Sequence, residues 1–238
     1  MQKTKLDRFI QKYNLNGNVN SVKWTSKGDT LATTFVTSDK SLMGSVTVDN
    51  VQFDEGDVGV YTTDLLQKLL GVLGDDVTLN VSKFGDKAVS LKVQNGTVSV
   101  DYTLSDLSVI PDPPTLKRVP EFQTNIKIDS HFIETFIKGK SALSDAETFT
   151  LITGDETQVV IGYASTNTNR VNIPVETTTN ELTDNISFNA NLFRDVLSAN
   201  KECTSAVLEV SNDGLLRVNF KVDDYDSTYY LVATQGVD

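Results

Sequence analysis

Few side chains in this sequence could do chemistry, and none of them completes a catalytic pattern. His131 is the only histidine among 238 residues, so a histidine-based triad or a multi-histidine metal site has little to work with. It stands beside Phe132 at the start of a predicted helix, where we expect a structural or exposed role. The sequence therefore predicts no catalytic residue, no metal site and no cofactor.

Two short motifs resemble ligand sites but lack required residues. Gly139-Lys140-Ser141 resembles the end of a phosphate-binding loop, but that motif needs a glycine five residues before Gly139, where Glu134 stands. The run from Asp223 to Asp226 lacks the glycine and the twelfth-position glutamate of a calcium loop. We expect a solvated turn there. Together these failures indicate a protein that is not an enzyme.

Cysteine content and hydropathy favour the cytoplasm. Cys203 is the only cysteine, so no intrachain disulfide can form. No stretch approaches the roughly 20 apolar residues of a membrane span, and the N-terminal residues lack the uncharged apolar core of a signal peptide. We expect a cytoplasmic protein with no membrane contact.

The charge distribution is more informative than the net charge of −11, which taken alone argues against nucleic acid. Four segments have helical apolar spacing, at residues 2–16, 62–73, 129–142 and 189–201. They hold nine basic and five acidic residues, so the helices carry +4 and the rest of the chain −15. The nine cations are Lys3, Lys5, Arg8, Lys12, Lys68, Lys138, Lys140, Arg194 and Lys201. Solvated helix faces would explain them, unless the fold gathers all four helices on one surface.

The elements that position these cations occur twice. A shift of about 127 residues superimposes the segment 57–81 on the segment 185–210, and it aligns Leu65 with Leu192 and Leu70 with Leu197. Each copy has the pattern strand, helix, strand. Strand-rich halves with few short helices exclude a doubly wound parallel sheet. We predict an α+β protein of two tandem similar domains, each with two short helices packed on antiparallel sheets.

Prolines mark the boundary between the halves. Four of the five prolines lie at positions 111, 113, 114 and 120, and proline removes ladder donors and stiffens extended backbone. We therefore assign residues 1–106 to an N-terminal domain, 107–120 to a connector and 121–238 to a C-terminal domain.

Local signals also predict the helix ends. Thr4-Lys5-Leu6-Asp7 resembles a capping box for the first helix, and Asn16-Gly17 should end it. Asp64 and Asn191 occupy the polar position in front of the two repeated helices, so we expect them to be capping residues.

Several segments carry a resemblance to a known family. They are Asp57-Val58-Gly59-Val60-Tyr61 running into Asp64-Leu65-Leu66, the following Gly74-Asp75-Asp76, and the closing Tyr229-Tyr230-Leu231-Val232-Ala233. With the duplication and the basic helices, they make the chain resemble a DNA sliding clamp, specifically the trimeric processivity clamp of T-even-like tailed bacteriophages. The closing segment also looks like the last strand of proliferating-cell nuclear antigen.

The resemblance implies a DNA-clamp fold that assembles as a homotrimeric ring around double-stranded DNA, which it contacts without reading sequence. It implies a processivity factor that tethers the replicative DNA polymerase, with a clamp loader and other replication or late-transcription proteins as further partners. The expected location is the cytoplasm of a bacterial host during phage infection. By family analogy, edge strands near residues 96–103 and 170–175 should pair between subunits.

The resemblance also implies two sets of site residues. The nine helix cations would face DNA, with Lys5, Arg8 and Lys12 as the leading candidates. An apolar groove would bind partner peptides through Leu42, Met43, Val46, Val109, Ile110, Tyr230 and Val232. Ordinary core packing is an equal alternative for Val46 and Val232, and a solvated surface charge is an equal alternative for each lysine.

A second interpretation belongs to another class. Acidic, β-rich, cysteine-poor chains without catalytic residues also occur among phage structural proteins of tails or capsids, and that is the alternative function. The duplicated plan with cations on the helices favours the clamp, because a structural β-protein has no need of them.

Overall fold

The computed structural model describes residues 1–116, 118–153, 156–163 and 169–234. The chain divides into two compact units. Unit 1 contains Met1–Ser38, Gly44–Pro114 and Asp223–Ser227, and unit 2 contains Asp39–Met43, Thr115–Val222 and Thr228–Asp238. Each unit therefore includes a short segment from the other half of the sequence.

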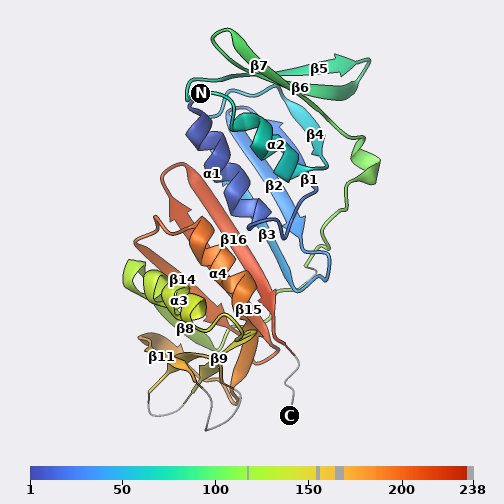
Figure 1. Ribbon diagram of the computed structural model, residues 1–238. Helices are drawn as coiled ribbons and strands as arrows, with labels where there is room; N and C mark the ends of the chain where they lie inside the picture. Colours follow the sequence, from blue (N-terminus) through green and yellow to red (C-terminus); the bar gives the residue numbers. More distant parts are fainter. Residues whose placement is uncertain (117, 154–155, 164–168, 235–238) are drawn as a thin grey trace. The chain divides into compact units, whose positions relative to one another are not determined.

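The first half of the chain forms two helices, four strands of a larger sheet and a separate three-stranded sheet (Figure 1). The four strands have the order β3-β2-β1-β4, and the three-stranded sheet has the order β5-β6-β7. The elements, in chain order, are α1 (Lys3–Asn14), β1 (Val22–Lys27), β2 (Thr30–Val36), β3 (Leu42–Val48), β4 (Gly56–Val60), α2 (Thr63–Leu70), β5 (Thr78–Phe84), β6 (Lys87–Asn95), β7 (Val98–Thr103) and the 3-10 turn η1 (Leu107–Val109).

The second half repeats this plan with two additional strands. Its strand orders are β11-β10-β9-β13 and β12-β8-β14-β15-β16. The elements are β8 (Thr124–Asp129), α3 (Ser130–Ala142), β9 (Thr148–Ile152), β10 (Gln158–Ile161), β11 (Val171–Pro174), β12 (Thr177–Asn180), β13 (Ile186–Asn189), α4 (Ala190–Ala199), β14 (Ser205–Val210), β15 (Leu215–Val222) and β16 (Tyr225–Val232).

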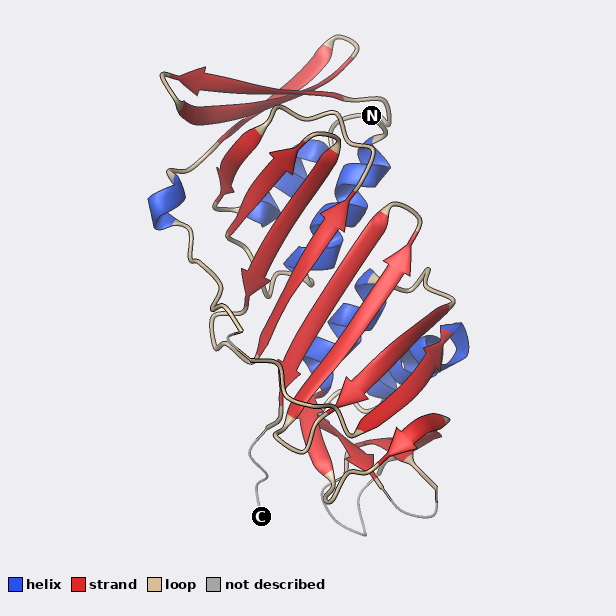
Figure 2. Ribbon diagram, turned by 180° about the vertical axis from the view of Figure 1, so that it is seen from behind, coloured by secondary structure: helices blue, strands red, loops and turns tan. Residues whose placement is uncertain are grey.

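The two halves have the same topology. The order β3-β2-β1-β4 corresponds to β11-β10-β9-β13, and β5-β6-β7 corresponds to β14-β15-β16. Helix α1 corresponds to α3 and helix α2 to α4, while β8 and β12 have no counterpart in the first half. The predicted α+β class and the predicted duplication are confirmed. In each half both helices lie on the same face of the strands (Figure 2).

The helix ends differ from the sequence prediction. Helix α1 begins at Lys3, and its N-cap Gln2 makes no side-chain capping bond, so the predicted capping box at Thr4 is wrong. The Lys3 amide donates to the Asp75 carbonyl oxygen instead. Helix α4 is capped by Asn189, whose side chain accepts a bond from the Leu192 amide, so the predicted cap Asn191 is also wrong. The helix begins at Ala190, directly after β13 ends at Asn189, so Asn191 already lies in its first turn.

Helix α2 takes its cap from a distant residue. The N-cap Thr62 makes no side-chain bond. The backbone amide of Asp64 donates instead to Asn20 Oδ1 at 3.0 Å, and the Asp64 carboxylate accepts from Asn20 Nδ2 at 3.2 Å. Asp64 is therefore not the capping residue that the sequence predicts; it lies in the first turn and accepts hydrogen bonds there.

An aromatic cluster fills the core of unit 1. The rings of Phe9 and Trp24 meet edge to face with centroids 5.6 Å apart. The Trp24 indole N–H donates to the Tyr13 hydroxyl at 3.3 Å, and that hydroxyl lies 3.3 Å from Thr63 Oγ1. Burial raises the pKa of Tyr13. These bonds satisfy the polar atoms that the aromatic residues carry into the core.

A phenylalanine cluster fills the core of unit 2. Phe193 of α4 stacks on Phe149 with a centroid separation of 4.8 Å and meets Phe136 of α3 edge to face at 4.9 Å. All three side chains are buried. The cluster fixes both helices on the strand β9, because each helix contributes one ring to it.

The described part of the chain contains no helix long and apolar enough to cross a membrane. Within the same residues no group of three or more acidic, histidine or cysteine side chains could hold a metal ion.

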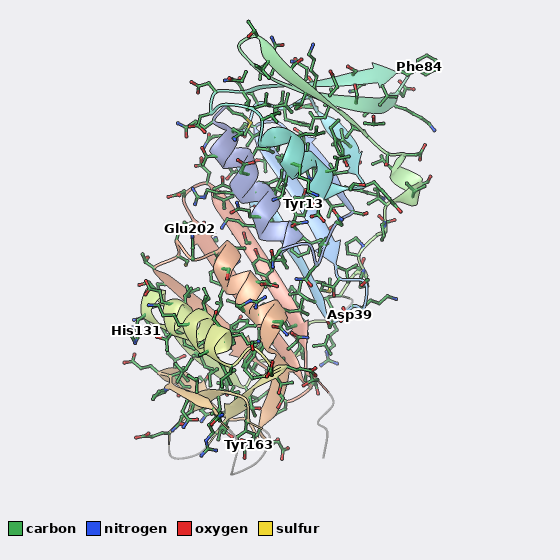
Figure 3. The ribbon with its side chains drawn as sticks, viewed as in Figure 1. Tyr13, Asp39, Phe84, His131, Tyr163 and Glu202 are labelled. Carbon is green, nitrogen blue, oxygen red and sulfur yellow. The ribbon has the colours of Figure 1, made fainter. Side chains whose placement is uncertain are left out.

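The substitution Phe136→Ala should lower the free energy of unfolding by about 3–5 kcal/mol, because it leaves a cavity between two packed rings. Phe84→Ala is the matched control, since Phe84 is 84% exposed at the end of β5 (Figure 3). The control should change stability by less than about 0.5 kcal/mol. Chemical denaturation of both variants measures the difference, and equal losses would contradict the packing of the phenylalanine cluster.

Candidate nucleic-acid interface

Helix α1 carries four of the nine predicted cations, and three of them are paired with acids. Lys3 Nζ lies 4.0 Å from the Asp7 carboxylate in the same helix. Lys5 Nζ is hydrogen-bonded to the Asp224 carboxylate and lies 3.3 Å from the carbonyl oxygen of Asn50. Both Arg8 Nη1 and Arg8 Nη2 lie 3.0 Å from one carboxylate oxygen of Asp223. We call Asp223–Asp224, which connects β15 to β16, the acidic turn. It is an exposed turn, as the sequence predicts, but its two acids are also paired with cations of α1.

The contacts of the acidic turn extend beyond the two ion pairs. Asn50 Nδ2 donates to Asp224 at 3.1 Å, and the Tyr225 hydroxyl donates to the Lys5 carbonyl oxygen at 2.8 Å. The Arg8 guanidinium lies 4.6 Å from the centre of the Tyr225 ring. The hydrogen bond from Lys5 lowers the pKa of Asp224, which keeps this carboxylate ionised at neutral pH.

The other two cations of α1 face protein groups. Lys12 is fully buried, with its ammonium 5.3 Å from the centre of the Tyr225 ring. Lys3 Nζ donates to the carbonyl oxygens of Leu70 and Leu73 near the end of α2, at 3.4 and 3.0 Å. Lys3 thus satisfies carbonyl groups that a helix end leaves without partners. Unlike those of Lys5 and Arg8, the side chain of Lys12 is buried in the core.

Helices α2, α3 and α4 carry the remaining five cations in mixed surroundings. Lys68 and Lys201 are exposed, and neither makes an ion pair or side-chain hydrogen bond to any described residue. Lys138 pairs with Glu134 at 3.1 Å one turn away on α3. Arg194 pairs at 2.8 Å with Asp195, whose side chain is only 8% exposed.

Lys140 is buried near the end of α3. Its ammonium donates to the carbonyl oxygens of Ser144 at 2.8 Å and Leu143 at 3.3 Å. Burial, together with the charge of Arg194, lowers the pKa of Lys140. Gly139 beside it packs tightly, since an added Cβ would lie 3.1 Å from Val171 Cγ1. Packing against β11 therefore explains the glycine of Gly139-Lys140-Ser141.

The cations of the four helices are thus largely neutralised or occupied inside their own unit. Those that reach solvent freely are Lys68 and Lys201, while Lys5, Arg8, Lys138 and Arg194 reach it in company with a carboxylate. A surface of this kind attracts phosphates weakly and offers no fixed array of donors for base edges.

The seven residues predicted for a peptide groove differ in exposure. Leu42, Val46 and Ile110 are buried, and Met43 and Tyr230 are half-buried. Val109 and Val232 are 56% and 52% exposed. The core-packing alternative is therefore correct for Val46 and not for Val232.

One of these residues lines a cavity within unit 2. The cavity has a volume of about 600 Å3 and is formed by Arg118, Pro120, Glu121, Gln123, Asn212, Asp213, Gly214, Leu215 and Val232. Pro120 and Arg118 come from the predicted connector, and Val232 comes from the end of β16. An apolar side chain flanked by polar groups could enter it.

Six of the described strands lie at the edge of a sheet, namely β4, β5, β7, β11, β12 and β13. Two of these edges belong to β7, which pairs only with β6, and to β11, which pairs only with β10. The two-residue turn Gly96-Thr97 makes Asn95 and Val98 the closing hydrogen-bonded pair. By alternation, the backbone groups of Ser99, Asp101 and Thr103 point away from β6 and out of the sheet.

The predicted pairing segments coincide with these edges. The range 96–103 contains β7, and the range 170–175 contains β11. Next to β11, residues 172–176 line a cavity of about 410 Å3 together with His131, which is exposed at the start of α3 (Figure 3).

The fold matches that of a known clamp. No family profile and no curated protein sequence matches the chain. Among solved structures, the crystal structure of proliferating cellular nuclear antigen from Entamoeba histolytica is similar, with a TM-score of 0.75 and 16% sequence identity. The match covers 99% of this chain and 97% of that one. The chain therefore has the two-domain DNA-clamp fold that the resemblance implied.

The acidic turn is the part of the site that sequence analysis missed. Asp223 and Arg8 are 215 positions apart, and no local pattern connects them. The only available signal was the opposite charge of the two segments, which many surface segments of an acidic protein share.

Amine labelling tests this placement of the cations. Lys68 and Lys201 should react rapidly with an amine-specific reagent, while Lys12 and Lys140 should react on the order of tenfold more slowly, because they must first be exposed by local opening. Mass spectrometry of peptides over a time course measures each rate. Under denaturing conditions the four rates should converge, and rapid labelling of Lys12 in the folded protein would contradict its burial.

Proposed function

We propose that this protein is a sliding clamp, a homotrimeric ring that encircles double-stranded DNA and tethers the replicative DNA polymerase. The observation that carries the proposal is the complementarity of the free edges of β7 and β11, because the repeat provides a template for how they pair.

The template is the pairing of β16 with β3. Strand β16 is the counterpart of β7, and β3 is the counterpart of β11. In unit 1 the Asp49 amide donates to the Asp224 carbonyl oxygen at 3.0 Å, and in unit 2 the Val232 amide donates to the Ser41 carbonyl oxygen at 2.9 Å. The same strand types thus already pair in this chain. A second copy can supply the β11 that the free edge of β7 lacks.

Pairing of this kind is head to tail. It uses two different surfaces of each copy, so it either closes into a ring or continues as a filament. Closure after three copies would repeat one strand pairing six times around the ring, three times within chains and three times between them. The free edges of β7 and β11 would then be satisfied, which removes two sites of non-specific strand addition.

The helices supply the proposed DNA contact. A weakly basic surface holds phosphates without reading bases, and topological linkage makes tight contact unnecessary. Lys68 and Lys201 are the strongest candidates for direct phosphate contact, followed by Lys5, Arg8, Lys138 and Arg194. Lys12 and Lys140 are buried and Lys3 binds carbonyl groups, so we assign these three to the stability of their units.

The polymerase and other partners would bind through short peptides. The cavity that Val232 lines is the proposed anchor point, since an apolar peptide residue could enter it while Arg118 and Glu121 contact polar groups at its rim. A clamp loader is also required, because a closed ring cannot pass onto circular DNA unaided.

The narrower proposal, a clamp of a T-even-like phage acting in the cytoplasm of its bacterial host, rests on the segments 57–66, 74–76 and 229–233.

Light scattering should give a mass of about 78 kDa, three times the 26.1 kDa chain. The substitution Asp101→Pro should reduce this mass at equal concentration, because proline removes an amide that points out of the free edge of β7. Asp101→Ala removes the same side chain and keeps the amide, so it should remain trimeric. A dimer at all concentrations, or a trimer in both variants, would contradict the proposed interface.

Threading onto linear DNA tests topological binding without a loader. A ring should associate with linear duplex whose ends are free and should be excluded when bulky streptavidin blocks biotinylated ends, or when the duplex is a closed circle. A protein that binds DNA in an open groove would bind all three in proportion to length. Cross-linking yields on the three substrates distinguish the outcomes. Failure to associate with any of them, by a trimeric protein, would favour the structural-protein alternative.

A further inference from the structure

The charges of α1 and of the acidic turn are not repeated by the duplication. Helix α1 lies in the first half of the chain and the acidic turn in the second. At the shift of 127 residues, Lys5 and Arg8 correspond to Phe132 and Thr135 of α3. The turn that corresponds to Asp223-Asp224 is Gly96-Thr97 between β6 and β7. The counterparts of the two cations and of the two acids are therefore all uncharged.

The acidic turn and its counterpart have the same backbone conformation. Asp223 has φ +52°, and its counterpart Gly96 has φ +55°. This left-handed conformation favours glycine, and aspartate and asparagine are the other residues that adopt it most often. The turn geometry therefore admits both residues, and only Asp223 brings a charge to Arg8.

The two acids of the turn contact the same donor groups of α1 that a bound phosphate would contact. Asp223 accepts from two nitrogens of one guanidinium, and Asp224 accepts from the neighbouring ammonium one helical turn away. Phosphate oxygens bind arginine and lysine with the same donor geometry. Both ion pairs reach solvent, since the Asp223 and Asp224 side chains are 66% and 41% exposed and the Arg8 and Lys5 side chains are 33% and 18% exposed. DNA could therefore compete for the two cations without unfolding the unit.

We propose that the acidic turn is an internal counterion that occupies Lys5 and Arg8 and so limits how strongly α1 holds the DNA backbone. This inference rests on the proposed function and adds a regulatory element to it. Weak attachment suits a protein that must slide, because each phosphate contact has to break at every step. In the wild-type protein, Lys5 and Arg8 bind either the acidic turn or a DNA phosphate. Each phosphate contact that breaks is replaced by a contact with the turn, so the free energy changes little as the ring moves.

The substitution Asp223→Asn tests the proposal. Asparagine tolerates the left-handed conformation, so the turn should persist while its charge is removed. Asp86→Asn is the matched control, because Asp86 is an exposed turn residue between β5 and β6 with no ion pair to any described residue, and it changes the net charge equally. Association with linear duplex is measured across a series of salt concentrations. Light scattering and thermal unfolding confirm that both variants remain assembled and folded.

Asp223→Asn should bind DNA several-fold more tightly at low salt than Asp86→Asn does. The slope of log affinity against log salt should steepen by about 0.9 for each Arg8 that gains a phosphate contact. A double-mutant cycle makes the assignment specific. In an Arg8→Gln background, Asp223→Asn should have no more effect than Asp86→Asn has there.

Three results would overturn the proposal in different ways. Equal affinities and slopes for Asp223→Asn and Asp86→Asn would show that the acidic turn does not compete with DNA, and would leave the clamp function intact. Tighter binding that persists in the Arg8→Gln background would show a general charge effect. A trimeric wild-type protein and trimeric variants that all fail to bind DNA would overturn the proposed function and this inference together.

Discussion

The structure depends on the pairing of backbone groups at strand edges. An edge strand exposes amides and carbonyls that must find partners. In this chain β3 and β16 satisfy one such pair of edges, as the bonds from Asp49 to Asp224 and from Val232 to Ser41 show. Their counterparts β11 and β7 stay open among the described strands. The same requirement that shapes each sheet therefore also directs how copies of the chain would assemble.

Because the fold is duplicated, each element of one half can be compared with its counterpart in the other half, and the differences between them are informative. The strand orders of the two halves agree, yet the aromatic cores differ: Phe9, Tyr13 and Trp24 in unit 1 and three phenylalanines in unit 2. Core composition is free to change as long as volume and apolarity are kept. The charged contact between α1 and the acidic turn follows a different pattern, because the counterparts of both sides, α3 and the turn Gly96-Thr97, lack the corresponding charges.

The electrostatic character of the helices follows from these contacts. An isolated lysine on a helix face is an available cation, but most of the nine helix cations have carboxylate or carbonyl partners in the same unit. A ring lined in this way would hold DNA by linkage rather than by affinity. The protein as a whole is acidic. Within the described part of the chain, its helices keep Lys68 and Lys201 as cations with neither an ion pair nor a side-chain hydrogen bond.

The sequence by itself determined the class, the duplication and the strand-rich plan, because apolar periodicity and hairpin signals are local properties. That the strands near residues 96–103 and 170–175 are edge strands was implied by the resemblance to a clamp. It missed the helix caps Asn20 and Asn189, whose roles depend on where strands end. Only the tertiary structure decided which cations are available. Burial of Lys12 and Lys140, and the pairing of Arg8 with Asp223, arise from residues far apart in the chain. Their side chains meet only after the sheets have formed, so no spacing in the sequence records them.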